Sequence, residues 1–375
     1  MEPRASAPWS GGFVSVLRGR TARVLGLALV VGMAGSGVAR SAVTFECELG
    51  VPAATMVLFD GHDHLRVPSM VEAEISLATL AGEGVSAGML ALGTPESGDL
   101  AISLDLQGAS SHAVFAFVNP PAVIDGSGAK VFDATTLTFV QSQLGAGARG
   151  VGEISLRHSG PPALGADIAA DAPGAMALYA EAGARGVPVT IHFETRDKSA
   201  PGVDIASRIE ELRAALTAHP GTIFIWSHMG DTGPDTVRDL IEEFPNLYAD
   251  ISTRNPYFVR GWPAGFQSLG AGPLGLGNLK VEWKLLFEDH PDRFLFGLDL
   301  ASTTRWDQLS DVMLFYRSVL GELSQTAAEK IGCTNARVLL AAAEVPGPGA
   351  PAIVVLVLGI SALGFLALGR GRRFS

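Results

Sequence analysis

Short apolar segments alternate with amphipathic ones over most of this chain, and this alternation constrains the fold more than any other feature. Eight of the apolar segments have the composition of β-strands and are bounded by Gly, Pro or polar residues. They span residues 56–59, 86–92, 113–118, 150–156, 187–192, 222–227, 247–251 and 294–298. The amphipathic segments between them include residues 133–145, 174–185, 204–218 and 235–243. Eight such units predict an α/β fold with parallel strands, a (β/α)8 barrel of the TIM type. A doubly wound open sheet is the alternative.

The amino-terminal residues 1–41 have the layout of a secretory signal peptide. Three arginines, Arg18, Arg20 and Arg23, precede an apolar run, and a stretch of small residues follows it. We expect cleavage before Ala42. An uncleaved membrane anchor is the alternative, although the apolar run is short for a membrane span.

The carboxy-terminal residues 345–375 predict a membrane anchor. Their uncharged, mostly apolar segment at residues 350–368 approaches the ~20 residues that a spanning helix needs. Three arginines after it favour a cytoplasmic end. With Val345-Pro346-Gly347-Pro348 before it, the tail resembles PEP-CTERM sorting signals, although Gly347 stands where those have Glu. The resemblance implies an exosortase-type processing enzyme as a partner. Either reading places the body, residues 42–344, on the periplasmic or extracellular face.

The body is strongly acidic. The whole chain has 27 Lys and Arg residues and 38 Asp and Glu residues. Residues 1–41 hold five of the basic residues and one acidic residue, and residues 345–375 hold three basic ones. The body therefore has 19 basic and 37 acidic residues, a net charge of −18. Phosphate contacts need clustered Lys and Arg, so nucleic acid is excluded as the main partner and a small-molecule substrate is expected.

The two cysteines, Cys47 and Cys333, are expected to be structural. They show no Cys-x-x-Cys spacing and no disulfide framework. In an exported protein they can form a disulfide. The sequence does not bring them together, so their pairing stays open, as does the oligomeric state.

Polar residues gather where the predicted strands end. The first strand runs into His62 and His64, which share one face and lie ~7 Å apart at the backbone, because side chains alternate along a strand. Later strands end in His192, His228 and Asp299. The active site of such a barrel lies at the carboxyl ends of its strands. All five side chains would converge there, which predicts a metal site.

The order of these motifs resembles the amidohydrolase superfamily, in particular its amidohydrolase-related (amidohydrolase-2) branch. The matching pieces are Asp60-Gly61-His62-Asp63-His64, Ile191-His192, Ser227-His228-Met229-Gly230 and residues 246–252, 293–299 and 330–336. The resemblance implies that His62, His64, His192 and Asp299 bind one divalent metal, most often zinc. It places His228 beside the activated water or the substrate carbonyl.

The same residues suit this chemistry on their own. Imidazoles and a carboxylate suit Zn²⁺ and leave an open position for water. The metal lowers the pKa of that water towards ~7 and polarises the scissile carbonyl. Asp299 is the expected catalytic base, which takes the proton of the water and delivers it to the leaving group. His228 is expected to stabilise the developing oxyanion.

Glu153 raises the alternative of two metals. Many members of the branch have a lysine-containing fourth strand, whereas Gly152-Glu153-Ile154 resembles the strand-four glutamate of TatD-type hydrolases. That resemblance implies a second ion, with Glu153 bridging and His192 and His228 shared. A structural pairing of Glu153 with Arg157 or another basic residue of the barrel is the other interpretation. One metal is the main prediction.

Four basic side chains near the strand ends are candidates for substrate contacts: Arg157, His158, Arg196 and Arg254. An arginine there would hold a carboxylate or phosphate, and a surface ion pair is the alternative for each. Asp60 and Asp250 are expected to orient metal-binding histidines. The loops at residues 195–202 and 254–278 are expected to set specificity.

These observations together predict an exported, membrane-tethered, metal-dependent hydrolase of amide, ester or lactone bonds. Three alternatives stay open. A decarboxylase, which is a carbon–carbon lyase, would use the same metal cradle. A TatD-like binuclear phosphoesterase would need two metals. A non-catalytic barrel would bind metal or ligand at the cell surface without turnover.

Overall fold

The computed structural model describes residues 45–65, 69–92, 99–158, 167–196, 204–259, 268–270 and 279–341. All of them belong to one compact unit, Ser41–Ser375. The predicted signal peptide at residues 1–41 and the predicted membrane segment at residues 345–375 lie outside the described residues. Within the described residues, no helix is both long enough and apolar enough to span a bilayer.

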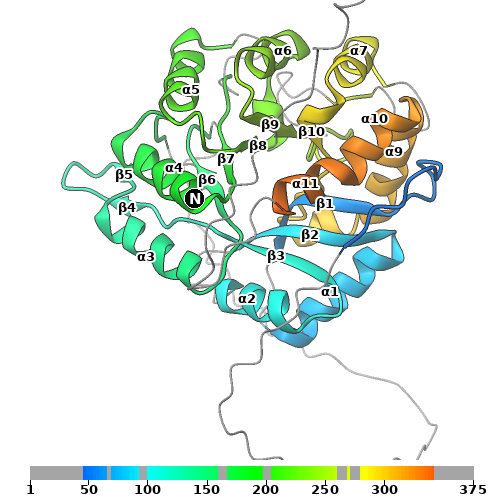
Figure 1. Ribbon diagram of the computed structural model, residues 1–375, viewed down its shortest axis with the longest axis horizontal. Coiled ribbons are helices and arrows are strands. Elements are labelled where there is room, and N and C mark those ends of the chain that lie inside the picture. Colours follow the sequence, from blue (N-terminus) through cyan, green and yellow to red (C-terminus); the bar gives the residue numbers. More distant parts are fainter. Residues whose placement is uncertain are drawn as a thin grey trace, which may run out of the picture. The chain divides into compact units, whose positions relative to one another are not determined.

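Eight strands of the described residues pair in parallel to form one sheet (Figure 1). They are β1 (Leu58–Leu65), β2 (Val85–Leu92), β3 (Ala113–Val118), β6 (Gly150–Ser155), β7 (Val189–His192), β8 (Phe224–Trp226), β9 (Leu247–Asp250) and β10 (Phe294–Leu295). Their order in the sheet is their order along the chain. Each strand therefore lies beside its successor, as in a singly wound barrel.

Backbone hydrogen bonds between the two ends of this order close the barrel. Gly61 N, on β1, donates to Phe296 O just after β10, over 2.8 Å. Asp299 N donates to His62 O over 2.7 Å. A sheet closed in this way has no free edge. The predicted (β/α)8 barrel is confirmed, and the open doubly wound sheet is excluded.

Helices connect the strands and lie outside the sheet (Figure 1). They are α1 (Met70–Gly82), α2 (Asp99–Ala109), α3 (Ala134–Gly145), α4 (Pro173–Arg185), α5 (Ala206–Ala218), α6 (Pro234–Glu243), α7 (Val281–Asp289), α8 (Thr303–Trp306), α9 (Leu309–Gly321), α10 (Gln325–Glu329) and α11 (Asn335–Ala341). Shorter turns are η2 (Ser227–Asp231), η3 (Pro291–Arg293) and the π-helical η4 (Lys330–Thr334).

Local sequence explains where several helices begin and end. Asp133 caps α3, since its side chain accepts the N–H groups of Thr135 and Thr136. Helix α4 begins at Pro173, whose ring fits a first helical turn. It ends at Gly186, which takes the left-handed conformation with φ of 66°. The four predicted helices at residues 133–145, 174–185, 204–218 and 235–243 correspond to α3 to α6.

All eight predicted strands are present, with different bounds at the two ends of the barrel. The predicted strand 56–59 is observed as Leu58–Leu65, because pairing with β2 continues to Leu65 and Leu92. Its two histidines therefore lie on the strand rather than after it. The predicted strand 294–298 shortens to Phe294–Leu295, because the N–H of Phe296 bonds to Ile331 O instead. A hairpin of β4 (Val123–Ile124) and β5 (Lys130–Val131) was not predicted, since two-residue strands carry no periodicity.

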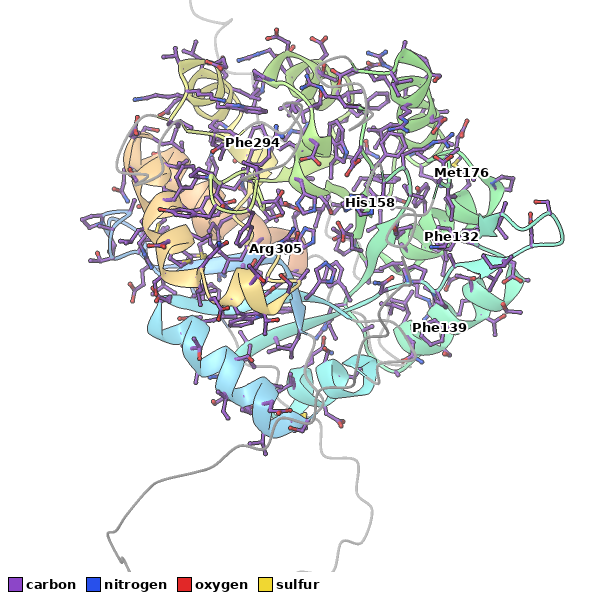
Figure 2. The ribbon with its side chains drawn as sticks, turned by 180° about the vertical axis from the view of Figure 1, so that it is seen from behind. Phe132, Phe139, His158, Met176, Phe294 and Arg305 are labelled. Carbon is purple, nitrogen blue, oxygen red and sulfur yellow. A yellow bond between two sulfur atoms is a disulfide. The ribbon has the colours of Figure 1, made fainter. Side chains whose placement is uncertain are left out.

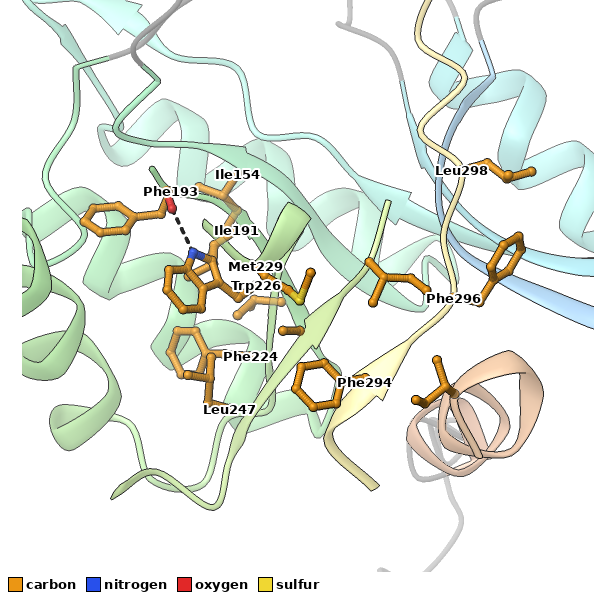
Figure 3. Packing of buried hydrophobic residues seen from close by; sticks show 14 of the residues in the cluster. Ile154, Ile191, Phe193, Phe224, Trp226, Met229, Leu247, Phe294, Phe296 and Leu298 are labelled. Atoms are coloured by element: carbon orange, nitrogen blue, oxygen red, sulfur yellow. Dashed lines mark hydrogen bonds between the residues drawn. The ribbon is translucent and has the colours of Figure 1, made fainter. Parts of the chain in front are cut away.

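Buried aromatic and aliphatic side chains fix the ends of β7 and β8 (Figure 3). Trp226 and Phe224 are fully buried among Ile191, Phe193 and Met229. The Trp226 indole Nε1 donates to Phe193 O over 2.7 Å, the dashed line in Figure 3. This bond satisfies both buried groups and holds the backbone just after β7 in place.

Cys47 and Cys333 form a disulfide bond, with their Cα atoms 5.9 Å apart and a sequence separation of 286. Cys47 precedes β1 and Cys333 lies in η4, after the last strand. Phe45 packs on the edge of Phe59 beside them, with ring centroids 5.5 Å apart. The disulfide therefore joins the segment before the first strand to the helix after the last one.

Candidate metal centre

His62 and His64 project from one face of β1, as the alternation of a strand requires. Their Nε2 atoms lie 3.4 Å apart, and both rings are buried. Two aspartates fix the backbone that carries them. Asp60 Oδ1 accepts the N–H groups of His62 and Leu298, each over 3.0 Å, and Asp63 Oδ1 accepts that of His64 over 2.8 Å. The strand with the histidines is thereby tied to the chain that follows β10.

Glu153, on β6, places its carboxylate at the centre of four imidazole rings. Its Oε2 lies 3.3 Å from His64 Nε2. Its Oε1 lies 3.0 Å from His192 Nδ1 and 3.6 Å from the Nε2 atoms of both His62 and His228. Glu153, for which the sequence left a bridging role open, thus contacts histidines from the ends of three strands.

Asp299 and His228 complete this cluster from the ends of β10 and β8. Asp299 Oδ1 lies 3.5 Å from His64 Nε2 and 4.0 Å from His62 Nε2. Its Oδ2 lies 3.6 Å from His228 Nε2. Both residues have positive φ angles, 55° and 56°, which non-glycine residues adopt rarely and often at functional sites. This turn after each strand directs the side chain towards the other ligand candidates.

Asp250, at the end of β9, and Ser252, just after it, determine which ring nitrogen of His62 and of His228 carries the hydrogen. Asp250 Oδ2 lies 2.9 Å from His62 Nδ1, and Ser252 Oγ lies 2.7 Å from His228 Nδ1. The hydroxyl of Ser252 donates its single proton to Asp250 Oδ1. A carboxylate accepts only, and this hydroxyl has no second proton, so both Nδ1 atoms carry the hydrogen. Nε2 is therefore the nitrogen of His62 and of His228 that is left for a metal ion.

The two carboxylates of the cluster are ionised at neutral pH. Burial raises the pKa of Glu153, but His192 and His62 outweigh burial and hold that pKa well below its usual range. Burial likewise raises the pKa of Asp299, yet Arg305 and the nearby histidines lower it to about 2. The buried cluster thus contains two negative charges, which favour a bound cation.

The histidines respond to the same charges in different ways. Burial lowers the pKa of His62, but Asp250 and Glu153 raise it well above its ordinary value. Burial lowers the pKa of His228 to about 4, so this ring is neutral at pH 7. The carboxylates around His62 therefore demand a compensating positive charge, either a proton or a metal ion at the same place.

The spacing of the donor atoms fits a divalent metal ion. Within the described residues, His62, His64 and Glu153 form a group whose ligand atoms all lie within 4.8 Å of one another. Adjacent donors in it are 3.3 to 3.6 Å apart. Tetrahedral ligands ~2.1 Å from one ion lie ~3.4 Å apart. The residues present therefore fit a metal without rearrangement of the strands.

His192 is oriented differently from the prediction that it shares an ion with His62 and His64. Its Nδ1 faces Glu153 Oε1 at 3.0 Å, and its Nε2 faces Glu194 Oε1 at 3.3 Å. The group at β1 contains Glu153 in its place. His192 instead belongs to two other groups, one with Glu153 and His228 and one with His158 and Glu194.

Comparison with known proteins decides the family. Residues 120–341 match the family model described as Amidohydrolase, which is more than half of the chain. The chain belongs to the amidohydrolase family. The match reaches from the end of β3 to α11, so it includes every strand that delivers a candidate ligand except β1. No protein of curated function matches the chain.

Several solved structures are similar to this amidohydrolase at low sequence identity. A Pseudomonas putida protein named as a candidate 2-pyrone-4,6-dicarboxylic acid hydrolase has a TM-score of 0.50 and 15% identity over 76% of this chain and 98% of its own. A TIM-barrel protein from Bordetella bronchiseptica has a TM-score of 0.48 and 17% identity over 76% and 99%. A 2,6-dihydroxybenzoate decarboxylase from Rhizobium has 0.45 and 15% over 76% and 98%. At these identities the likeness concerns the fold alone.

Two of the predicted substrate arginines of this amidohydrolase form ion pairs within the protein. Arg157 binds Asp167 and Glu211, with both closest contacts at 2.6 Å. Its suggested structural pairing with Glu153 is not observed, because the guanidinium turns away from the cluster. Arg196 Nε lies 3.0 Å from Asp204 Oδ1. For both, the observed geometry is the ion pair that the sequence left as the alternative.

Arg254 is the predicted substrate arginine with the most unused hydrogen-bonding capacity. It is fully buried, and burial lowers its pKa to about 10. Its Nη2 donates to Thr232 O over 2.5 Å, and its Nη1 lies 3.6 Å from Asp231 Oδ1. Its Nε makes no hydrogen bond with the described residues. The predicted specificity loops at residues 195–202 and 254–278 fall partly outside the described residues.

Three residues of the site escaped sequence reasoning: Glu194, Ser252 and Arg305. Glu194 follows His192 by two residues, so the alternation used for His62 and His64 would have found it. Arg305, on α8, donates to both the carboxylate and the backbone oxygen of Asp299. It carries no sequence signal, because the contact depends on the turn after β10.

Proposed function

We propose that this amidohydrolase is a metal-dependent hydrolase that cleaves an amide, ester or lactone bond with an activated water. One observation carries the proposal: three imidazole Nε2 atoms and two ionised carboxylates converge at the carboxyl ends of the strands. These are His62, His64, His228, Glu153 and Asp299. Imidazole nitrogens and carboxylates together suit zinc among the common divalent metals.

His62, His64 and Glu153 would hold the ion, with His228 and Asp299 completing the set. A divalent ion held there supplies Lewis acidity, which makes water nucleophilic at neutral pH and polarises the scissile carbonyl. The protein keeps the ligands in place through Asp250, which binds the His62 ring at Nδ1. It also keeps the site dry, because all of these ligand side chains are largely buried.

Asp299 is the group that we assign to proton transfer. Its ionised carboxylate accepts a proton from the attacking water and returns it to the leaving nitrogen or oxygen. Arg305 binds Oδ2, so Oδ1 is the oxygen that faces His64 and that would accept the proton of a water. Arg305 therefore acts as a positioning residue for the base.

We assign to His228 a role different from that of the expected oxyanion donor. Its Nδ1 carries the proton, donated to Ser252, and its neutral ring presents a lone pair at Nε2. A lone pair cannot donate to an oxyanion. We therefore assign His228 as a ligand candidate, and the positive charge at the centre takes over the stabilisation of the oxyanion.

We also propose that the protein is exported and tethered to the membrane. The arginine-flanked apolar segment of residues 1–41 and the tail at residues 345–375 support this proposal. The Cys47–Cys333 disulfide supports it independently, because such bonds persist in oxidising compartments. Processing by an exosortase-type enzyme belongs to the same proposal.

A two-metal phosphoesterase is the second candidate function. The position of Glu153 favours it, since Oε1 lies between His62 on one side and His192 and His228 on the other. A carboxylate placed in this way can bridge two ions, and a pair of ions suits an in-line displacement at phosphorus.

The test uses the full-length chain purified in detergent, analysed for metal by elemental analysis and assayed on a panel of substrates. The panel contains esters, lactones, amides, carboxylated aromatics and phosphodiesters. We expect bound zinc, hydrolysis of at least one ester, lactone or amide, and loss of turnover in Asp299→Asn. His64→Asn should lose metal, whereas the matched His219→Asn, at the carboxyl end of α5, should keep both metal and turnover.

Other outcomes would overturn the hydrolase. Release of carbon dioxide from a carboxylated aromatic without hydrolysis would make the protein a decarboxylase. Turnover confined to phosphodiesters would favour the two-metal function. A protein that binds zinc fully but turns over no member of the panel, with no difference in Asp299→Asn, would be a metal-binding barrel.

A further inference from the structure

Beside the cluster around β1 lies a second group of donors, formed by His158, His192 and Glu194. His158 follows β6 and is labelled in Figure 2, and His192 ends β7. Glu194 Oε1 lies 3.3 Å from His192 Nε2 and 3.7 Å from His158 Nε2. All three ligand atoms lie within 4.8 Å of one another. These separations bracket the ~3.4 Å expected between tetrahedral ligands of one zinc ion.

The orientation of the His192 ring shows which of its nitrogens is available. Nδ1 lies 3.0 Å from Glu153 Oε1, a hydrogen bond to a carboxylate. A metal-binding histidine typically donates its other N–H to a carboxylate, which fixes the ring and its tautomer. Nε2 is then the nitrogen of His192 that faces Glu194, and a metal ion there would take the place of a ring proton. The ring of His158 lies against it, with centroids 4.2 Å apart.

The backbone that carries this group is held on several sides. Trp226 Nε1 donates to the backbone oxygen of Phe193, the residue between His192 and Glu194. Glu194 N donates to Arg157 O over 2.8 Å, and Arg208 Nη1 donates to Glu194 O over 3.1 Å. The donors therefore sit on fixed main chain, which favours a preformed site over a chance contact.

We propose that His158, His192 and Glu194 form a second divalent-metal site, distinct from the group at His62, His64 and Glu153. Two imidazoles and one carboxylate form the His₂Glu set that binds zinc in catalytic sites with a position left for a further ligand. The side chains of His158 and His192 are 17% and 13% exposed and that of Glu194 is 3% exposed. The exposed edges leave room for water or a substrate oxygen as the fourth ligand.

The group of Glu153, His192 and His228 is the other place for a second ion, and the test must distinguish the two placements. Glu153, His192 and His228 also lie within 4.8 Å of one another. An ion there would bind His192 through Nδ1, which now contacts Glu153. An ion at the proposed site binds His192 through Nε2. The two placements differ in whether His158 and Glu194, or His228, are required.

The experiment measures metal stoichiometry and does not depend on any substrate. Full-length protein in detergent is stripped with a chelator, loaded with Co²⁺ or Zn²⁺, and analysed for bound metal, with the visible absorption of Co²⁺ as a second reading. We expect two ions per wild-type chain. Glu194→Gln and His158→Gln should each bind one ion, and His64→Gln should lose the other ion. Glu322→Gln and His219→Gln, which change matching residue types elsewhere, should bind two.

The outcomes separate this inference from the proposed function. Two ions in both Glu194→Gln and His158→Gln, with one in His228→Gln, would place the second ion at Glu153 and overturn the proposed site. One wild-type ion that only His64→Gln removes would leave the hydrolase centre and refute the second site. One wild-type ion that only Glu194→Gln and His158→Gln remove would support the site at His158, His192 and Glu194 and refute the centre at His62 and His64. No ion at all would refute both. Circular dichroism and thermal melts confirm that each variant is folded.

Discussion

Asp250 and His62 are 188 residues apart in sequence, yet their side chains meet in the barrel with Oδ2 2.9 Å from Nδ1. Both side chains are fully buried. The other carboxylate oxygen accepts the backbone N–H of His228 over 3.0 Å. One residue of β9 therefore orients a metal-binding ring from β1 and the loop after β8. This arrangement makes Asp250 the first residue to test.

Asp250→Asn should weaken zinc binding by about 10- to 100-fold, the usual cost of removing a partner that orients a ligand. An amide that presents its NH₂ group to His62 forces the ring proton onto Nε2, the nitrogen needed by the metal. Competition with a chromophoric chelator measures the affinity. Asp307→Asn, an exposed change of the same kind, is the control. Equal affinities in the two variants would show that Asp250 does not control the tautomer.

Replacement of Arg305 should lower kcat more than it changes KM or metal content. The Arg305 guanidinium binds Oδ2 and the backbone oxygen of Asp299 and lies 4.9 Å over the Phe258 ring. Arg305→Ala frees the base to rotate, so we expect kcat to fall at least about tenfold with KM changed little. Arg305→Lys keeps the charge and should recover part of kcat. Metal content should stay that of the wild type in both, and a loss of metal instead would make Arg305 a structural support of the ligand set.

The disulfide should contribute strongly to stability. It closes a loop of 286 residues, from the segment before β1 to η4. A cross-link of this kind restricts the unfolded chain, and removal of a native disulfide typically costs about 2–5 kcal/mol. Urea unfolding of Cys47→Ser/Cys333→Ser should therefore show a lower midpoint than the wild type. Reductant should lower the wild-type midpoint and leave the double variant unchanged; an effect of reductant on both would point to another cause.

The sequence was sufficient for the barrel because each strand carries its own signal. Apolar runs bounded by Gly and Pro located all eight strands, and the two-residue alternation placed His62 and His64 on one face. The features that the sequence did not predict are contacts between individual side-chain atoms. Nothing in the sequence tells that Nδ1 of His192 faces Glu153 while Nε2 faces Glu194. That choice depends on the tertiary arrangement of the strand ends and decides which candidate ligand each nitrogen of His192 faces.

Contacts made after a turn were beyond sequence reasoning as well. Arg305 reaches Asp299 because the chain reverses at a residue with positive φ. Arg157 finds Glu211 at a separation of 54 residues, on a helix packed outside the barrel. The two cysteines meet only because the closed barrel brings its first and last segments together. Each contact requires the tertiary arrangement, whereas the strand pattern is local.

Asp204 links three segments near the strand ends, and its ionisation should make stability depend on pH. Its carboxylate accepts the hydroxyls of Thr195, Thr232 and Thr236 over 2.6 to 2.7 Å, and it pairs with Arg196. Burial raises the pKa of Asp204, but these donors outweigh burial and lower it below its ordinary value of 3.8. The folded state thus prefers the carboxylate more than the unfolded chain does. This contribution is complete above pH 3.8 and is lost as the pH falls through the lowered pKa.

Asp204→Asn should therefore reduce the free energy of unfolding by about 2 kcal/mol at pH 7, the scale of a hydrogen bond to a charged group. An amide presents one acceptor oxygen where the carboxylate presents two, so at least one threonine hydroxyl loses its partner. Urea titrations at pH 7 and at a pH below the lowered pKa of Asp204 measure the difference between variant and wild type. It should shrink at the lower pH, where protonation of Asp204 removes the same contacts from the wild type. A difference of equal size at both pH values would show that the threonines need only a polar neighbour and not a charge.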